Sequence, residues 1–538
     1  MSLLRKASIV TTPTSYENGK ILSVKPVPSL GSELVTNGDF ATDSDWTLGT
    51  GWTISGGAAN QDGSNGILRQ SNVAPLNTKF KVTFDLTNYN GNGGLTIKLA
   101  PTQYDVTLNG NGTYNIFTDG TNTLNDSLQI ISSNGFVGSI DNVSVKEVLD
   151  ADFDFTRNSS ATRVNSQGLI EDITSNLPRI DYTGGEGHWL FEPQSTNTAT
   201  YSNDFTQGDI FVSSADPSVQ EVVLTSQQSI SPDGTNNAWK LVDNNDGLTG
   251  QAALNYYATT VIANNYNTIS YFVKKQGSNN FVFIAINGLD AGANGNTWFN
   301  IQNGTLGNVS ANHTANIQNY GNGWYRISIT MQTTTDVVGA FVLRLATSNG
   351  TGNILRDGTN GVYLFGVQAE SDASRQFMTS YIPTNGSQIT RLADAALGAG
   401  SSDLINSTEG VLYAEIAKLD VTGLEGGIRL SKDTNNEIRL NFAPNNRINV
   451  FVNVGGVNQA YIDNSTFNLE NYNKIAIKYK LNDYVLFING NKVHTDTNTL
   501  VPANMSELKF NNFFGRTKCV AVFKEALTDA ELTCLTTI

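Results

Sequence analysis

The chain has 538 residues and a mass of 58.0 kDa, enough for three or four domains of ordinary size. Only 15% of the residues are charged, the net charge is −15, and Asn and Gly (50 Gly) supply much of the remaining sequence. Asn and Gly favour turns over helix interiors, and an acidic surface repels phosphate backbones. The composition therefore argues against a helical protein and against a nucleic-acid-binding protein.

Residues 1–32 form a short basic segment at the start of this acidic chain, with a net charge of +3. The segment contains scattered apolar residues but too few for a core of its own. Such a segment becomes ordered when it packs on a partner. We predict an extended N-terminal arm that docks on another protein; a frayed terminus is the alternative.

Strand patterns recur from residue 34 to the end, separated by turns rich in Asn and Gly. Residues 79–86 and 324–331 alternate between apolar and polar, residues 281–286 are apolar on both faces, and residues 475–493 contain two hairpin turns. The convincing helix signal is a capping box at residues 528–531. We predict an all-β fold of three tandem antiparallel β-sandwich domains (jelly-roll or concanavalin A-like) behind the arm.

The sequence offers little for metal, redox or membrane chemistry. Cys519 and Cys534 have neither zinc-like nor redox spacing, and the three histidines lie far apart. No apolar run reaches the roughly 18 residues of a membrane helix, and the first residues lack a signal-peptide core. We expect a protein made in the cytoplasm, without membrane insertion.

Changes in composition set the domain boundaries. A run of Ala, Gly and Ser before the last unit indicates a flexible linker. The predicted segments are the arm 1–32, a first unit 33–148, a connector 149–198 rich in Arg, Asp and Pro, a second unit 199–394, the linker 395–402 and a third unit 403–538.

Four motifs of the first unit are Leu34–Phe40, Trp46, Gly51–Thr53 and Ile140–Val145. Through them the unit resembles a jelly-roll carbohydrate-binding module. The resemblance implies glycan binding, and a structural calcium ion where the first and last strands meet. Carboxylate oxygens suit that ion, and the implied ligands are Asp39 and Asp141. Capping of turns is the alternative role for both acids.

Further motifs carry three more resemblances. Residues 201–205, 231–235, 323–326, 363–370 and 379–384, followed by Arg391 and Asp394, make the second unit similar to sandwich domains of phage particle proteins. Residues 410–415, 475–493 and 522–532 make the third unit resemble concanavalin A-like or laminin-G-like sandwiches. Residues 1–26, 152–165 and 177–182 resemble the opening of tail- and head-fibre proteins of tailed phages, with the first unit inserted between them.

Together these resemblances imply a structural protein of a phage particle, either a tail fibre or a head (capsid) fibre. Such a protein would be made in the host cytoplasm and displayed on the virion surface. It would dock on phage particle proteins through residues 1–32, form a homotrimer, and bind host-surface or environmental glycans. The alternatives are a bacterial surface adhesin that binds glycans and a polysaccharide depolymerase.

Sugar recognition uses aromatic faces for stacking, and amides or carboxylates for the hydroxyls. For Trp52 a core position is the alternative. We expect no enzyme, because Glu415 and Asp420 would lie on opposite faces of one strand rather than as a catalytic pair. The candidate glycan-binding residues are Trp52, Tyr89, Tyr104, Tyr114, Tyr256, Tyr257 and Trp298.

Overall fold

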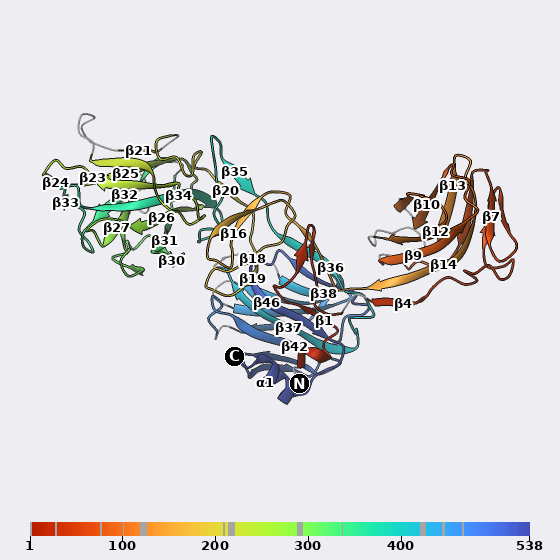
Figure 1. The fold of residues 1–538 in the computed structure, drawn as a ribbon. Coiled ribbons are helices and arrows are strands. Elements are labelled where there is room, and N and C mark those ends of the chain that lie inside the picture. Colours follow the sequence, from red (N-terminus) through yellow and green to blue (C-terminus); the bar gives the residue numbers. More distant parts are fainter. Residues whose placement is uncertain are drawn as a thin grey trace. The chain divides into compact units, whose positions relative to one another are not determined.

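The computed structural model describes residues 3–26, 29–75, 78–99, 102–118, 126–207, 210–212, 221–287, 294–335, 337–419, 427–443, 447–464 and 467–538. Antiparallel strands dominate these residues, which confirms the all-β prediction (Figure 1). The chain forms two compact units. The inserted unit is Lys25–Ala151, and the main unit combines residues 1–24 with Asp152–Ile538. None of the described helices is long and apolar enough to span a membrane.

The inserted unit is a sandwich of two sheets. Alternation along β9 places Phe80, Val82, Phe84 and Leu86 in its core, where each is 0% exposed. One sheet has the order β11 (Thr102–Val106), β10 (Gly94–Leu99), β13 (Leu128–Ser133), β8 (Gly66–Gln70), β5 (Thr47–Leu48). The other has the order β12 (Gly112–Phe117), β9 (Phe80–Thr87), β14 (Val137–Leu149), β7 (Ala59–Asp62), β6 (Trp52–Ile54), with β4 (Ser29–Glu33) also on β14.

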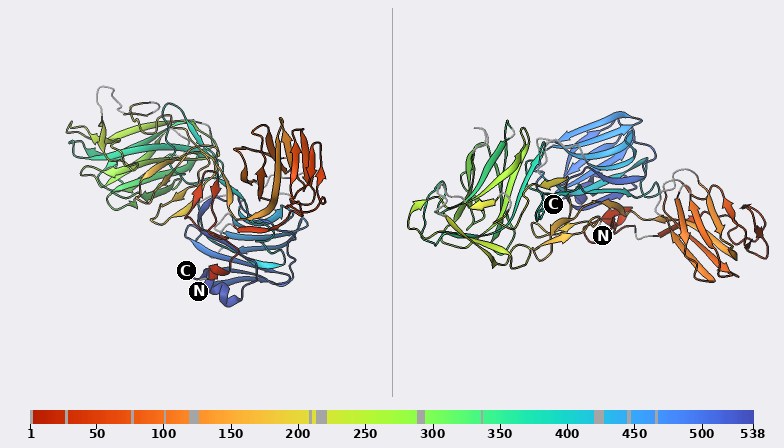
Figure 2. Two further views of the ribbon diagram at one scale, coloured as in Figure 1. Left: turned by 45° about the vertical axis from the view of Figure 1, so that its right-hand side comes forward. Right: turned by 90° about the horizontal axis from the view of Figure 1, so that it is seen from above.

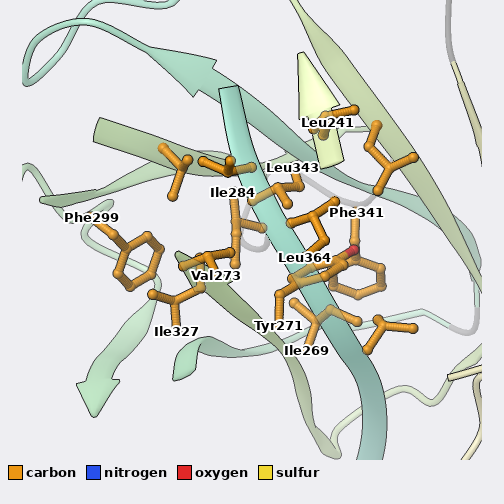
Figure 3. Packing of buried hydrophobic residues seen from close by; sticks show 14 of the residues in the cluster. Leu241, Ile269, Tyr271, Val273, Ile284, Phe299, Ile327, Phe341, Leu343 and Leu364 are labelled. Carbon is orange, nitrogen blue, oxygen red and sulfur yellow. The ribbon is translucent and has the colours of Figure 1, made fainter. Parts of the chain in front are cut away.

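The second sandwich, within the main unit, has two six-stranded sheets with an apolar layer between them (Figure 3). Ile284 and Leu343 from one sheet meet Val273 and Leu364 from the other. The first sheet is β21 (Ile210–Val212), β25 (Ala253–Val261), β32 (Val337–Ala346), β27 (Phe281–Asn287), β28 (Gly295–Asn300), β29 (Thr305–Leu306). The second is β22 (Val222–Ser229), β23 (Ala238–Asp243), β34 (Gly361–Asp372), β26 (Tyr266–Lys275), β31 (Trp324–Gln332), β30 (Thr314–Asn319).

The C-terminal sandwich draws its strands from three parts of the chain. One sheet is β18 (Ile180–Asp181), β19 (His188–Phe191), β46 (Gly515–Phe523), β37 (Glu409–Lys418), β42 (Asn473–Lys480), β43 (Tyr484–Ile488), β44 (Asn491–Asp496), with β1 (Ile9–Thr11) also on β46. The nine-stranded sheet is β2 (Tyr16–Glu17), β3 (Lys20–Ile21), β15 (Phe153–Thr156), β36 (Ala395–Ala399), β45 (Glu507–Asn511), β38 (Gly427–Asp433), β39 (Asn436–Ala443), β40 (Arg447–Val454), β41 (Val457–Asn464).

Smaller elements complete the main unit. The α-helix α1 (Asp529–Thr536) begins at the predicted capping box, in which Thr528 and Glu531 exchange hydrogen bonds. A short 3-10 helix covers Leu3–Lys6. Three two-stranded ladders are β16 (Ala161–Val164) with β17 (Ile170–Ile173), β20 (Ser195–Asn197) with β35 (Ile389–Arg391), and β24 (Thr249–Gly250) with β33 (Ile354–Leu355).

The N-terminal segment is not a free arm, and that prediction is wrong. Strand β1 pairs with β46, with Ile9 opposite Val522, and Figures 1 and 2 show this red segment against the blue C-terminal strands. Ile9, Val10 and Ile21 are at most 5% exposed. The chain itself supplies the apolar partner that we expected from another protein.

The predicted connector and linker are also strands. Residues 149–198 contribute β15, β18 and β19 to the two sheets of the C-terminal sandwich. The predicted linker contains β36, where Ala396 and Ala399 are 0% exposed. Ala396 lies opposite Phe155 and Phe510 on the neighbouring strands. Small side chains beside large rings fill a core layer evenly, which explains a run of Ala and Gly inside a sheet.

Candidate functional site

The aromatic candidates of the inserted unit pack on its core. Trp52 is 4% exposed, so the core alternative describes it. Tyr89, Tyr104 and Tyr114 are half-buried against the same core. The rings of Tyr89 and Tyr114 stack on core phenylalanines at centroid distances of 5.7 and 5.3 Å, so each has one face already used.

In the second sandwich, Trp298 has a similar structural role. Its half-buried indole stacks on Phe283 at a centroid distance of 4.9 Å, and its Nε1 donates to the Thr351 carbonyl at 3.2 Å. Tyr256 and Tyr257 belong to β25, but their side chains lie outside the described residues. The aromatic candidates whose side chains are described therefore pack on the cores of their own sandwiches.

Asp39 and Asp141 each bind the backbone close to their own position. The Asp39 carboxylate accepts from the Ala41 N–H at 3.4 Å, and the Asp141 carboxylate accepts from the Asn142 N–H at 2.6 Å. Calcium takes six to eight oxygen ligands. Among the described residues no three His, Cys, Asp or Glu side chains gather as a metal site. Both carboxylates cap turns, which is the alternative role, and the calcium site stays a prediction.

Charged residues from distant motifs meet in a buried ion-pair network at the ends of strands. Asp394, directly before β36, binds Arg157 at 3.1 Å and Arg179 at 2.5 Å. Glu192, directly after β19, binds Arg179 at 2.7 Å and Arg391 at 2.6 Å. None of the five is more than 3% exposed. The motif residues that seemed characteristic in the sequence thus hold the main unit together.

The electrostatics of this network favour its charged form. Burial alone would raise the pKa of Glu192, but Arg391 and Arg179 lower it well below the usual range. The Ser380 hydroxyl adds a hydrogen bond to this carboxylate at 2.6 Å. Burial lowers the pKa of Arg157 to about 10, which still leaves it protonated at neutral pH. Asp394 and Glu192 are thus both occupied by arginine partners and hold the strand ends together.

A polar cavity of about 570 Å³ lies beside this network. Asp181, His188, Arg326 and Glu192 are among its lining residues. Asp181 accepts two backbone N–H groups at 2.8 Å, and burial lowers the pKa of His188, which is therefore neutral at pH 7. Asp181 and Glu192, two of the acids that line this cavity, are thus engaged in holding its walls.

One face of the nine-stranded sheet combines aromatic and polar groups in a regular array. Buried apolar residues such as Ile438 and Leu440 on β39 point to the core of the C-terminal sandwich, so their neighbours lie on the other face of the nine-stranded sheet. The strand register places one residue from each of five adjacent strands side by side on that face. We call these residues the cross-strand row: Lys509, Arg429, Arg439, Phe451 and Tyr461.

The side chains of the cross-strand row contact one another. The Arg439 guanidinium lies 4.3 Å from the centre of the Phe451 ring, and the Phe451 and Tyr461 rings are 4.8 Å apart. Tyr461 is 49% exposed, whereas Arg429 is 7% exposed. The Asn449 amide lies 2.9 Å from the Tyr461 hydroxyl. The row therefore runs from a buried cationic end to an accessible aromatic end.

Three buried polar atoms near this row have no hydrogen-bond partner among the described residues. They are Arg429 Nε, Ser431 Oγ and Asn441 Oδ1. Ser431 and Asn441 occupy the same face as the row, because Ser431 pairs with Glu437 and Asn441 pairs with Gly427. Buried polar groups are usually satisfied, and leaving one unpaired costs about 1–3 kcal/mol. Among the described residues, this face therefore leaves three buried polar atoms without a hydrogen bond.

Sequence reasoning missed this face. The alternation along residues 438–442 and 448–452 was visible and indicated which side chains point away from the core. The register that places Arg439 beside Phe451 was not visible, because it depends on how separate strands align.

No family model matches the chain, and no curated protein matches it. One similar solved structure is domain 4 of AbnA, a GH43 extracellular arabinanase from Geobacillus stearothermophilus, in complex with arabinotriose. It has 13% identity and a TM-score of 0.23, and the match covers 30% of this chain and 83% of that one. Another is the N-terminal CBM22-1-CBM22-2 tandem domain of Paenibacillus barcinonensis Xyn10C, with 9% identity, a TM-score of 0.21, and coverage of 64% of this chain and 99% of that one.

Proposed function

We propose that the chain is a glycan-binding protein and that the cross-strand row is its binding surface. The observation that carries the proposal is the position of Phe451 and Tyr461 within a field of guanidinium, amide and carboxylate groups on one sheet face. Pyranose rings present C–H faces that stack on aromatic rings, and hydroxyls that pair with planar polar groups. A sheet face offers both without any change in the fold.

The form of the surface favours a polymer over a single sugar. Phe451 and Tyr461 lie on neighbouring strands, which are about 4.8 Å apart, so two successive sugar units of one chain can meet the two rings. Each stacking contact contributes about 1 kcal/mol, which gives single-site dissociation constants in the millimolar to micromolar range. Several copies that bind one repetitive polymer would raise the overall affinity.

The test compares Tyr461→Ala and Tyr461→Phe with the unchanged protein in affinity electrophoresis on a panel of bacterial surface polysaccharides. Loss of the ring should weaken retention about fivefold, and Tyr461→Phe should retain most of the binding because the ring remains. Because Tyr461 is half-exposed, the melting temperatures of both variants should stay close to that of the unchanged protein. Leu481→Ala, an exposed apolar residue in the turn after β42, is the matched control. Equal retention of Tyr461→Ala and Leu481→Ala would refute this site.

A finer proposal concerns where this binding takes place. We propose that the chain is a structural protein of a phage particle, a tail or head fibre that forms a homotrimer on the virion surface. It is supported by the sequence resemblance of residues 152–165 and 177–182 to fibre proteins. Residues 3–24 lie within the C-terminal sandwich, so attachment to the particle would use a folded surface rather than a free arm. A calcium ion and catalysis have no role in this proposal.

Mass spectrometry of purified particles, together with sedimentation of the isolated protein, tests this setting. We expect the chain in the particles and a species near three times 58.0 kDa. A species of 58.0 kDa alone would contradict the trimer, and display on uninfected bacteria would favour the adhesin alternative. New reducing ends after incubation with a bound polysaccharide would favour the depolymerase alternative.

A further inference from the structure

Three turns of the main unit surround a pocket of about 440 Å³. The first turn, residues 165–168, lies between β16 and β17; the second, residues 182–185, lies between β18 and β19; the third, residues 319–321, lies between β30 and β31. The lining consists of these turns and Val164, so the pocket shares no described residue with the cross-strand row. Its volume is within the roughly 300–1,000 Å³ that is typical of small-molecule sites.

Hydrogen bonding and packing hold the three turns in place. The Tyr182 N–H donates to the Val164 carbonyl at 2.9 Å, which ties the second turn to the hairpin of the first. Ile170 of that hairpin packs in one apolar cluster with Phe272. The ring of Tyr320, in the third turn, packs on Phe272 at a centroid distance of 4.9 Å. The pocket is therefore preformed, and a preformed site loses less entropy when a ligand binds.

The pocket is lined by polar groups, and none of its described side chains is charged. The side chains are two tyrosines, three amides, two aliphatic hydroxyls and one valine. Four glycines add uncovered backbone, because a Cβ on any of them would meet no atom within 4 Å; they are Gly168, Gly184, Gly185 and Gly321. Amides and hydroxyls both donate and accept hydrogen bonds, as sugar hydroxyls do. Such a lining matches a neutral ligand with several hydroxyl groups.

From this arrangement we infer that the pocket between the three turns is a second carbohydrate site, which binds a single neutral sugar unit. The ring of half-buried Tyr182 lies over the backbone of Gly187, where a Cβ would come within 3.2 Å of it. The rest of this ring offers an aromatic surface to the C–H face of a sugar. Gln167 is an exposed lining residue whose amide pairs with the sugar hydroxyls. This site goes beyond the proposed function, since it is separate from the cross-strand row and takes one sugar rather than a polymer.

Other classes of small ligand fit this pocket less well. An anion or a cation would lose hydration without meeting an opposite side-chain charge in the described lining. A wholly apolar ligand would cover amide and hydroxyl groups without replacing their hydrogen bonds to water, which is also costly. A neutral sugar avoids both costs. Charged sugars therefore serve as comparison ligands.

The experiment measures binding of free monosaccharides to the full chain by ligand-observed NMR. The probes are neutral hexoses, a deoxyhexose and N-acetylhexosamines, with glucuronate and glucosamine as the charged comparison. We expect a neutral sugar to bind with a dissociation constant of about 1 mM. Ser166→Trp, which fills the pocket from an exposed turn position, should weaken this binding at least about tenfold, and Gln167→Ala about fivefold. Gln228→Ala, at an exposed glutamine of β22 outside the pocket, is the matched control.

The outcomes separate this inference from the proposed function. Tyr461→Ala should bind the monosaccharide as the unchanged protein does; a loss there would assign the sugar to the cross-strand row and overturn the inference. The inference also fails if no neutral sugar binds at up to about 50 mM, if Ser166→Trp binds normally, or if a charged sugar binds equally well. Monosaccharide binding without any retention on polysaccharides would refute the cross-strand row and leave the pocket standing. Melting temperatures close to that of the unchanged protein would show that both pocket variants are folded.

Discussion

At the scale of single residues, Glu192 shows how burial and charge combine in this protein. Its carboxylate binds arginines that are 13 and 199 positions away in the sequence. Removing one partner from a buried ion pair typically destabilises a protein by about 3–5 kcal/mol, because the remaining charge is left without compensation. Exposed pairs such as Lys20 with Glu17 contribute at most about 1 kcal/mol.

The network predicts a loss of stability in acid. Since Arg391 and Arg179 hold the pKa of Glu192 below its ordinary value of 4.5, the unfolded chain takes up this proton first as the pH falls. The stabilisation is fully present above about pH 4.5 and decreases as the pH drops toward the folded-state pKa. The free energy of unfolding, measured with denaturant between pH 7 and pH 3, shows this decrease.

The matched variants are Glu192→Gln and Glu17→Gln, the latter in the exposed pair with Lys20. At pH 7 the first should lose about 3–5 kcal/mol and the second less than about 1 kcal/mol. The stability of Glu192→Gln should also fall less steeply below pH 4.5, since one titrating group is gone. Identical pH profiles for both variants would contradict the role assigned to Glu192.

At the scale of elements, β1 predicts that the N-terminus is needed for the fold. Removing residues 1–24 exposes the edge of β46 and the apolar surface under Ile9 and Val10. An uncovered sheet edge promotes aggregation. We expect the truncated chain to melt at a lower temperature and to be largely insoluble, as thermal denaturation and the soluble fraction would show. Lys6→Ala, which removes only an exposed ion pair with Glu531, should behave like the unchanged protein.

Local patterns predicted which segments are strands, and non-local pairing decided where they lie. Alternation placed Phe80 and Val82 in a core correctly, because side-chain direction follows from strand geometry alone. Ile9 finds its partner at Val522, and no local signal indicates a contact over that separation. Composition predicted a linker at residues 395–402 because small residues occur both in linkers and beside large rings in a core.

For the binding surface too, local patterns indicated single residues, and non-local pairing decided which of them meet. The Asn- and Gly-rich surroundings of Trp298 in the sequence indicated an exposed ring, yet its indole stacks on Phe283. The residues next to a ring in the sequence indicate a nearby turn. The exposure of the ring depends on which distant segments of the chain pack over it. Phe451 and Tyr461 meet only through the register of β40 and β41.

At the scale of the whole molecule, we predict that the main unit folds without the inserted unit. The Ser23 N–H donates to the Asp152 carboxylate at 2.7 Å, so the two points where the main unit is interrupted lie together. Replacing residues 25–151 with a short Gly/Ser linker should leave the main unit folded, with its melting transition and its Tyr461-dependent glycan retention intact. Residues 25–151 expressed alone should fold as a separate sandwich with its own core. Failure of the shortened main unit to fold would show that the insertion supports it.

The pairing of β1 with β46 also sets an order of events during synthesis. The ribosome completes Ile9 long before Val522 exists, and at about 5–20 residues per second the interval is on the order of half a minute to two minutes. During that interval the inserted unit can fold, since all of its strands have emerged, while β1 waits with its apolar side chains uncovered. A nascent chain of this protein therefore presents an unpaired N-terminal strand to chaperones until its last strands leave the ribosome, and premature termination anywhere before β46 leaves that strand without a partner.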